Sequence, residues 1–409
     1  MVAPQTGWES GEAFTTHTQE TAFLTQIASD TGATLSQAGL SANGTPLNRL
    51  DIGNNAGGTW LIVAMQHGNE CAPREGTLAF VRDLAYSNDP EIVDYLSNHR
   101  IVLLAGANPD GFPTSRFNGN NQDINRHHYG LVQPEAMAIA KTIRATGAAF
   151  IMDVHGRDDI TSPNDWEFAT TSVPSAHPSM LDIAQELKTS MGEAAAARGY
   201  STTVYPPSGP GAGTLSKAAA THHAVCLLSE TWGPGGTPAR VAVTRNMLED
   251  ARQWHATQSD NLAAARALSK AAAQANSGSY HLETVSGTII YDPAPAGYQM
   301  IGRTAVPARL VDGFGITADS NGFITMAQDA RWAIPIIMDT ISPASSLSTD
   351  RIGGEIWVEP GPDPDPDPEP SDLQPLGIPI GYRVCVGTEY YEVAKVTIGT
   401  ADGPVTIWP

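Results

Sequence analysis

Histidine and glutamate side chains follow directly after apolar runs at three places in the chain. His67 and Glu70 stand in MQHGNE after WLIVA, His155 stands in DVHG after AAFIM, and Glu230 stands in LSETWG after HAVCL. Histidine nitrogens and carboxylate oxygens are ligands of catalytic Zn²⁺, which takes three protein ligands and keeps a fourth position open for water. His67, Glu70 and His155 would make such a ligand set. Glu230 would then be the spare carboxylate that accepts a proton from water.

Each of these segments also has a structural explanation when it is taken alone. Gly68 and Asn69 are ordinary turn formers, and a lone histidine near a strand end is more often structural than a ligand. Their shared position at strand ends favours function, because ligands of open α/β sheets bind at the carboxyl ends of strands. An isolated carboxylate is also costly to bury, which favours a functional role for Glu230.

The segments that must position these residues alternate between helical and strand patterns. We expect helices at residues 18–33, 73–86, 133–147, 179–200 and 238–276, and buried strands at 59–67, 99–111, 148–156 and 222–233. Continuous apolar runs indicate strands that are covered on both faces. Strands that alternate with helices are typical of α/β proteins. The sequence therefore predicts an α/β fold whose mixed, mostly parallel sheet is sandwiched by helices.

The composition changes after residue 276. Residues 277–359 are rich in Gly, Thr, Ile and Val without helical periodicity, which predicts a β-rich domain after a catalytic domain at 1–276. Residues 360–370, PGPDPDPDPEP, predict a stiff, extended acidic linker. Residues 371–409 predict a small β module that needs a partner surface or self-association to be stable. The fold is thus expected to end in small all-β modules.

Charge and composition limit the classes of partner. The formal net charge of −20 and the pI of about 4.8 argue against nucleic acid and against anionic membranes, which would repel the chain. No stretch approaches the length of a membrane span, and the opening MVAPQTGWES lacks the features of a secretory signal. The three cysteines, Cys71, Cys226 and Cys385, give neither a disulfide framework nor a cysteine zinc cluster.

Taken in chain order, the motifs resemble those of zinc carboxypeptidases of the carboxypeptidase A type. The wider family includes the succinylglutamate desuccinylases and aspartoacylases. The resemblance covers about residues 10–275 and rests on HGNE, NPDGFPTSR, DINR in place of Asp-Leu-Asn-Arg, DVHG, TTVYPPSG and LLSETWG. It implies a carboxypeptidase-like fold that holds one Zn²⁺ ion.

The resemblance also implies a role for each matching residue. His67, Glu70 and His155 would bind zinc, Asp123 would orient a ligand histidine, and Arg116 would stabilise the oxyanion. Asn125 and Arg126 would grip the terminal carboxylate of the substrate, Tyr205 would close over the substrate, and Glu230 would act as general base and then general acid. His127, His128, His222 and His223 are expected to be structural or exposed rather than ligands.

The implied activity is hydrolysis of an amide bond next to a free C-terminal carboxylate. Two other functions stay open. HGNE and DVHG read closer to the small-substrate acylases, so an N-acyl amino acid deacylase is one alternative. A structural or receptor-binding protein with an idle peptidase domain is the other. The expected pocket floor near Ala212 carries neither an acid nor a bulky residue, so the sequence assigns no terminal-residue preference.

The β modules and the acidic linker indicate delivery as part of a larger particle. A bacteriophage tail protein that cuts cell-wall peptides would fit this organisation, with other virion tail proteins as possible partners. The expected location is the virion, or otherwise the cytoplasm.

Overall fold

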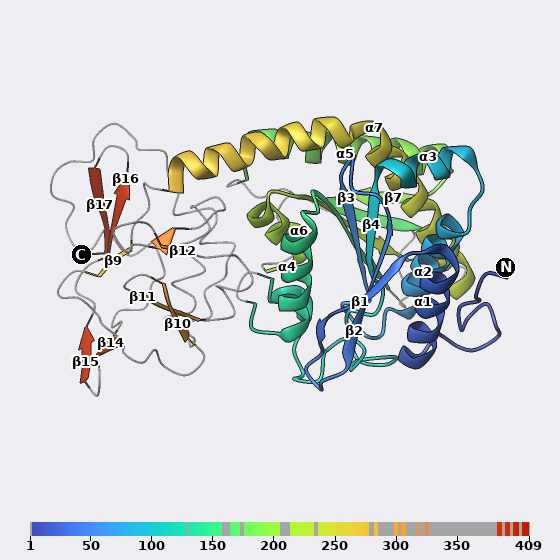
Figure 1. The fold of residues 1–409 in the computed structure, drawn as a ribbon, viewed down its shortest axis with the longest axis horizontal. Coiled ribbons are helices and arrows are strands. Elements are labelled where there is room, and N and C mark those ends of the chain that lie inside the picture. Colours follow the sequence, from blue (N-terminus) through green and yellow to red (C-terminus); the bar gives the residue numbers. More distant parts are fainter. Residues whose placement is uncertain are drawn as a thin grey trace. The chain divides into compact units, whose positions relative to one another are not determined.

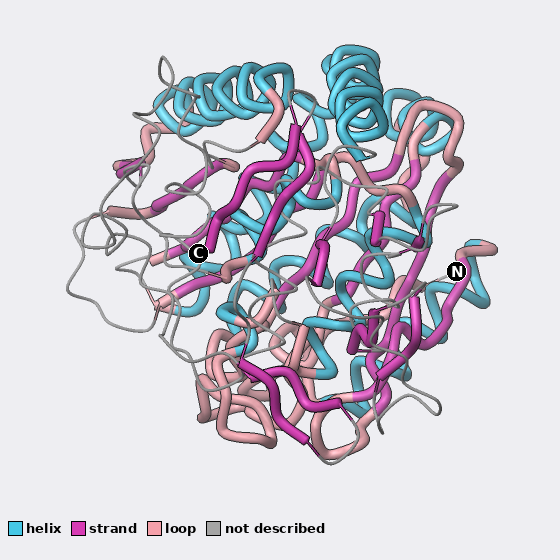
Figure 2. The backbone as a smooth tube through the Cα atoms, turned by 90° about the vertical axis from the view of Figure 1, so that its left-hand side faces the viewer, coloured by secondary structure: helices cyan, strands magenta, loops and turns pink. Residues whose placement is uncertain are grey.

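The computed structural model describes most of the first 277 residues and short strands beyond them (Figure 2). The described ranges are residues 2–128, 131–157, 164–171, 176–204, 213–232 and 236–277, with strand segments between 282 and 408. Tyr205, Ala212 and the linker at 360–370 lie outside the described residues. The chain divides into two compact units, one of residues 1–172 and 178–267 and one of residues 173–177 and 268–409.

An eight-stranded mixed sheet forms the centre of the first unit. Its order is β1-β2-β4-β3-β5-β8-β6-β7. The strands are β1 (Thr34–Leu40), β2 (Pro46–Gly53), β3 (Thr59–Ala64), β4 (Arg100–Leu104), β5 (Phe150–Gly156), β6 (Trp166–Thr170), β7 (Thr202–Val204) and β8 (Val225–Thr231). The central strands β4, β3, β5 and β8 run parallel, while β1 and β2 are antiparallel at one edge and β6 is antiparallel to β8. The α/β class and the mixed sheet are therefore confirmed.

Helices cover both faces of this sheet (Figure 1). The helices are α1 (His17–Thr31), α2 (Cys71–Ala85), α3 (Pro90–Asn98), α4 (Pro134–Thr146), α5 (Pro178–Ala197), α6 (Leu215–Ala218) and α7 (Thr237–Ser277), with the 3₁₀ turns η1 (Ile124–Arg126) and η2 (Ala219–His222). Residues of α1, α2, α5 and α7 pack on one face, and residues of α4 and α6 pack on the other. None of the described helices combines the length and apolarity that a membrane crossing requires.

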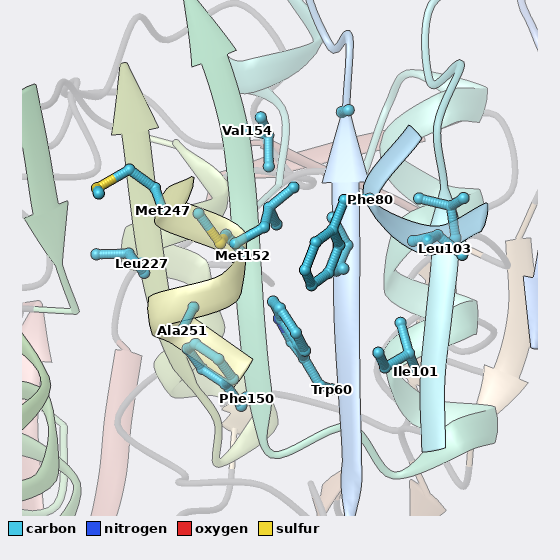
Figure 3. Packing of buried hydrophobic residues seen from close by; sticks show 14 of the residues in the cluster. Trp60, Phe80, Ile101, Leu103, Phe150, Met152, Val154, Leu227, Met247 and Ala251 are labelled. Atoms are coloured by element: carbon cyan, nitrogen blue, oxygen red, sulfur yellow. The ribbon is translucent and has the colours of Figure 1, made fainter. Parts of the chain in front are cut away.

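Large aromatic side chains fill the core on the first face (Figure 3). Trp60 of β3 stacks on Phe150 of β5 with ring centroids 5.5 Å apart, and Phe80 of α2 meets the Trp60 ring edge-on. All six residues of β3 and all seven of β5 are buried, as expected for apolar runs without alternation. The core therefore fixes the two strands whose ends lead into the candidate site.

The second unit contains short described strands. They are β9 (Leu282–Thr284), β10 (Tyr298–Ile301), β11 (Thr304–Pro307), β12 (Thr317–Ala318), β13 (Ile324–Thr325), β14 (Arg383–Val386), β15 (Glu389–Glu392), β16 (Val396–Thr400) and β17 (Gly403–Trp408). Antiparallel pairing joins β10 to β11, β12 to β13, β14 to β15, and β16 to both β17 and β9. The division into modules at 277–359 and 371–409 stays a prediction.

Candidate metal and catalytic site

Three predicted metal ligands meet at the carboxyl ends of β3 and β5. The Nδ1 atoms of His67 and His155 lie 3.2 Å apart, and the Glu70 carboxylate reaches both, with Oε1 at 2.7 Å from His67 Nδ1 and Oε2 at 2.8 Å from His155 Nδ1. All three residues are buried, and one potential ligand atom from each lies within 4.8 Å of the others. Among the described residues this is the group of His, Cys, Asp and Glu side chains arranged to hold a metal ion.

This arrangement fits zinc. In a tetrahedral site with metal–nitrogen bonds of about 2.0–2.1 Å, two ligand atoms lie about 3.3–3.4 Å apart, close to the separation of the two Nδ1 atoms. Two nitrogens and one carboxylate are also a ligand set that zinc enzymes use, with one position left for water or substrate. The structure therefore supports the prediction of one zinc ion, held by His67, Glu70 and His155.

A carboxylate holds the outer nitrogen of each ligand histidine. His67 Nε2 lies 3.0 Å from Asp123 Oδ1, and His155 Nε2 lies 2.9 Å from Asp153 Oδ1. A carboxylate at Nε2 fixes the tautomer that leaves Nδ1 free to bind metal, and it raises the basicity of the ligand. The Asp123 contact places that residue where the resemblance expects it.

The charges of this cluster keep Glu70 ionised, as metal binding requires, but favour protonated imidazoles, which must lose a proton before they can bind a metal. Burial alone would lower the pKa of His67 and His155 and raise that of Glu70. The charge of Glu70 reverses this for His67, the charges of Asp153 and then Glu70 reverse it for His155, and the histidine charges hold the pKa of Glu70 well below its usual range. Metal binding to the free site would therefore release protons from the imidazoles.

Two backbone features shape the turn after β3. Met65 is buried and adopts a left-handed conformation with φ of 57°, which a non-glycine residue reaches only at a cost. Gly68 allows a close approach: a Cβ atom there would lie 2.3 Å from the carbonyl carbon of Gly111. Asn108 fastens the same two loops together by donating to the carbonyl of Gln66 at 3.1 Å. Glycine at position 68 thus allows the HGNE turn and the NPDG loop to come into close contact.

Two arginines stand beside the ligands with partly exposed side chains. Arg116 donates to Asp123 Oδ2 through Nε at 3.0 Å, and its Nη1 lies 3.9 Å from Glu70. Arg126 donates to the carbonyl of Asn125 at 2.6 Å, and its Nη1 lies 4.0 Å from the same Asp123 oxygen. Their side chains are 41% and 43% exposed, so both guanidinium groups can reach a bound anion while Asp123 positions them. Their roles in oxyanion and carboxylate binding stay predictions.

Asn125 lies deeper than its expected role requires. Its side chain is buried, its Nδ2 donates to Asp153 Oδ2 at 3.1 Å, and its Oδ1 accepts from the backbone N–H of Leu215 at 2.8 Å. The same Nδ2 lies 2.9 Å from His155 Nε2. In this structure the amide braces Asp153, the carboxylate behind the ligand His155, and a grip on the substrate carboxylate stays a prediction.

Glu230 supplies a carboxylate without a ligand role. It pairs in register with His155 across the parallel strands β8 and β5. Its Oε2 atom is buried and has no hydrogen-bond partner among the described residues. Burial, followed by the negative charge of Glu70, raises the pKa of Glu230 to about 7. A carboxyl group that titrates near neutrality is suited to accept and return a proton at physiological pH.

The structure thus brings the predicted site residues together, apart from Tyr205, which lies outside the described residues. Sequence reasoning missed Asp153 and Gln66. Asp153 interrupts an apolar run two residues before His155, so strand alternation puts both side chains on one face, and this spacing could have identified it.

Part of the chain is similar in sequence to zinc carboxypeptidases. Residues 21–131 match the model of the zinc carboxypeptidase family. Human carboxypeptidase D is 30% identical over 113 residues, which cover 23% of this chain and 8% of that protein. Mouse carboxypeptidase M is 31% identical over 113 residues, covering 23% of this chain and 26% of that protein. The chain therefore matches only a small part of these relatives.

Among solved structures, the metallo-carboxypeptidase of Burkholderia cenocepacia is similar, with 18% identity and a TM-score of 0.49, covering 59% of this chain and 69% of the other. The family match spans His67, Glu70, Arg116, Asp123, Asn125 and Arg126 but ends before β5. The structure places His155 next to His67 and Glu70, and Glu230 next to His155.

Proposed function

We propose that this chain is a zinc-dependent carboxypeptidase, which hydrolyses the amide bond next to a free C-terminal carboxylate. The observation that carries the proposal is the convergence of His67, Glu70 and His155 beside Glu230, whose buried Oε2 has no hydrogen-bond partner among the described residues. A zinc-binding residue set and a free base side by side are what metal-assisted amide hydrolysis needs.

The metal and the protein would divide the work of hydrolysis. Zinc, when bound by His67, Glu70 and His155, supplies Lewis acidity that polarises the scissile carbonyl and acidifies water. Glu230 takes a proton from the attacking water as the C–O bond forms, and then gives that proton to the nitrogen of the leaving group as the C–N bond breaks. Arg116 offers a fixed cation for the negative charge that develops on the carbonyl oxygen.

Arg126 gives the site its preference for a chain end. An exposed guanidinium can donate two parallel hydrogen bonds to a carboxylate, and Asp123 and the Asn125 carbonyl hold this one beside the ligands. A substrate anchored by its terminal carboxylate would present the adjacent amide to the metal. This anchoring distinguishes an exopeptidase from an enzyme that cuts within a chain.

We also propose that the natural substrates are cell-wall peptides and that the protein acts within a bacteriophage tail. The support is the sequence after residue 276, where β-rich segments and the acidic linker at 360–370 follow the catalytic domain. Peptidoglycan stem peptides end in carboxylates, which suits recognition by Arg126.

A substrate panel with metal analysis tests the proposal. The purified protein, loaded with zinc, is offered peptides with free and amidated C-termini, muropeptides, and N-acyl amino acids. Release of a terminal residue from free-ended peptides or muropeptides alone is the expected result. Turnover confined to N-acyl amino acids would identify a deacylase instead, and no turnover of any substrate by zinc-loaded protein would contradict catalysis.

A further inference from the structure

A buried chain of hydrogen bonds runs from the ligand His155 to His128, starting at the ring nitrogen Nε2 and not at Nδ1, which faces the other two ligands. Asp153 Oδ1 lies 2.9 Å from His155 Nε2 and accepts from Gln66 Nε2 at 2.6 Å. Gln66 Oε1 lies 2.6 Å from His128 Nε2. All four side chains are buried, with 2% exposure or less. This network joins the ends of β3 and β5 to the segment that follows η1.

The contacts fix the direction of the hydrogen bonds that run from Asp153 through Gln66 to His128. The ionised Asp153 only accepts, so the Gln66 amide donates to it and turns its oxygen towards His128. His128 must then carry its proton on Nε2 and donate to Gln66. Burial lowers the pKa of His128 to about 4, which keeps the ring neutral, as this arrangement requires. A metal on Nδ1 requires the His155 proton on Nε2, which then donates to Asp153, and the Asn125 amide bonds Asp153 rather than the ring.

The same network holds the turn that carries Arg126. Asn125, directly before Arg126, donates to the second oxygen of Asp153 at 3.1 Å. His128, two residues after Arg126, joins the network through Gln66, and its backbone N–H donates to the carbonyl of Gly213 at 3.0 Å. Arg126 is thus flanked by two buried side chains that both lead to the carboxylate behind His155.

We propose that Gln66 and His128 are positioning residues, which hold the metal ligand His155 and the Arg126 turn in one fixed geometry. Neither residue is one of the predicted metal ligands or substrate-binding residues. Gln66 completes the set of donors on Asp153 and so keeps that carboxylate directed at His155. His128 keeps Gln66 oriented and ties the Arg126 turn to it. The effect on Arg126 rests on the proposed carboxypeptidase function, whereas the effect on the metal ligand does not.

The test compares two His128 variants with a matched control. His128→Gln places an N–H donor where the histidine Nε2 lies, so it should keep the bond to Gln66. His128→Leu and Gln66→Leu remove that donor or its acceptor. His255→Leu is the control, because His255 is also buried and bonds the Tyr95 hydroxyl at 2.9 Å, outside the network. Zinc affinity is measured by chelator competition, together with melting temperature and the absorption spectrum of the Co²⁺-loaded protein.

Both leucine variants of the network should bind zinc about 10- to 100-fold more weakly than the wild type and show an altered Co²⁺ spectrum. His128→Gln should restore most of the affinity, and His255→Leu should lose melting temperature without losing affinity. If Gln66→Leu does not fold, the comparison of His128→Leu with His128→Gln decides the test. Unchanged zinc affinity in His128→Leu, or an equal loss in His255→Leu, would overturn the proposal.

Kinetics on peptides with a free C-terminus separate the two halves of the proposal. At saturating zinc, His128→Leu should show a raised KM as well as a lowered kcat, because the Arg126 turn moves with the network. Weaker zinc binding with an unchanged KM would overturn the link to Arg126. If the wild type releases no terminal residue, the proposed function fails, and the zinc measurements still decide the role of the network.

Discussion

His155 and Glu230 are register partners on the adjacent parallel strands β5 and β8. Paired residues of neighbouring strands point to the same face of a sheet, so the ligand and the carboxylate project together from its carboxyl edge. The two carboxylate oxygens of Glu70 contact the Nδ1 atoms of His67 and His155, whereas Glu230 Oε2 has no hydrogen-bond partner among the described residues. The sheet register therefore places Glu230 beside His155, and the contacts of Glu70 leave Glu230 as the carboxylate predicted to move a proton.

Glu230→Gln should abolish turnover while zinc content stays near that of the wild type. Glutamine keeps the shape of the side chain but cannot accept a proton, so kcat should fall by about 10²- to 10⁴-fold or more. The exposed Glu193 of α5 provides the control, since Glu193→Gln should leave kcat unchanged. A Glu230→Gln enzyme that keeps more than about a tenth of wild-type kcat, a smaller loss than removal of a general base causes, would show that another group is the base.

The pH dependence of catalysis should contain an acid limb that belongs to Glu230. Burial, and then the charge of Glu70, raises its pKa to about 7, and a bound metal cation would favour the carboxylate and move the limb below that value. The base must be deprotonated, so kcat/KM should rise with pH through this limb. Profiles of kcat/KM for the zinc-loaded protein would show it, and a flat profile on the acid side would contradict the assignment.

The same raised pKa predicts how Glu230 affects stability in the metal-free protein. The folded protein holds a proton on Glu230 up to about pH 7, whereas the unfolded chain releases it near the ordinary value of 4.5. The stability that protonated Glu230 contributes below pH 4.5 is therefore lost as the pH rises through about 7. Metal-free Glu230→Gln should melt at a higher temperature than metal-free wild type at about pH 8, and this advantage should vanish near pH 4. An equal difference at both pH values would exclude the titration of Glu230 as its cause.

Removal of either ligand histidine should release the metal. His67→Ala and His155→Ala each leave two protein ligands, and a catalytic zinc site has only three to hold the ion. Zinc content after dialysis should fall from about one ion per chain to a small fraction. The buried His255, which lies outside the site, is the matched control, and His255→Leu should keep its zinc. Full metal content in both alanine variants would contradict the ligand assignment.

The parts of the fold that the sequence predicts well are those whose residues are buried on both sides. β3, β5 and β8 are continuous apolar runs, so their existence and the position of the residues after them could be read directly. β1 has a largely exposed face and β7 has only three residues, so neither leaves an apolar run to detect. These two edge strands were therefore not predicted.

The ligands and the base of the site were predictable because each is a chemically distinctive residue at the end of a strand. The network of Asp153, Gln66 and His128 behind them was not predictable. Gln66 and His128 are 62 residues apart, and nothing in either segment marks the other as its partner. Asp123 was found because it stands in the DINR motif, whereas Asp153 has an equivalent contact with a ligand histidine but stands inside an apolar strand.

Arg126 should set the requirement for a free terminal carboxylate. Arg126→Ala removes a charge-assisted contact worth about 2–3 kcal/mol, so kcat/KM on free-ended peptides should fall by on the order of 10²-fold. On C-terminally amidated peptides the wild type should already be slow, and the substitution should change little. Arg144→Ala, at an exposed position of α4, is the control that removes a cation without touching the site. Equal wild-type rates on free and amidated peptides would point to an endopeptidase.

Gly68→Ala should damage the metal site through the backbone. An added Cβ would lie 2.3 Å from the Gly111 carbonyl carbon and 2.6 Å from the Phe112 nitrogen, and backbone atoms cannot rotate away as a side chain can. The HGNE and NPDG loops must then separate, which displaces His67 from Asp123 and shifts Arg116 with its loop. Overpacking of this kind costs about 1–3 kcal/mol, and both zinc affinity and kcat should fall.

Gly192→Ala in α5 is the matched control, because its Cβ would meet only the Phe168 ring at 3.9 Å and alanine favours the helix by about 1 kcal/mol. Gly68→Ala should therefore lower both the melting temperature and the zinc affinity, whereas Gly192→Ala should raise the melting temperature and leave the zinc affinity unchanged. If Gly68→Ala keeps wild-type zinc affinity and stability, close contact between the two loops is not what requires glycine in this motif.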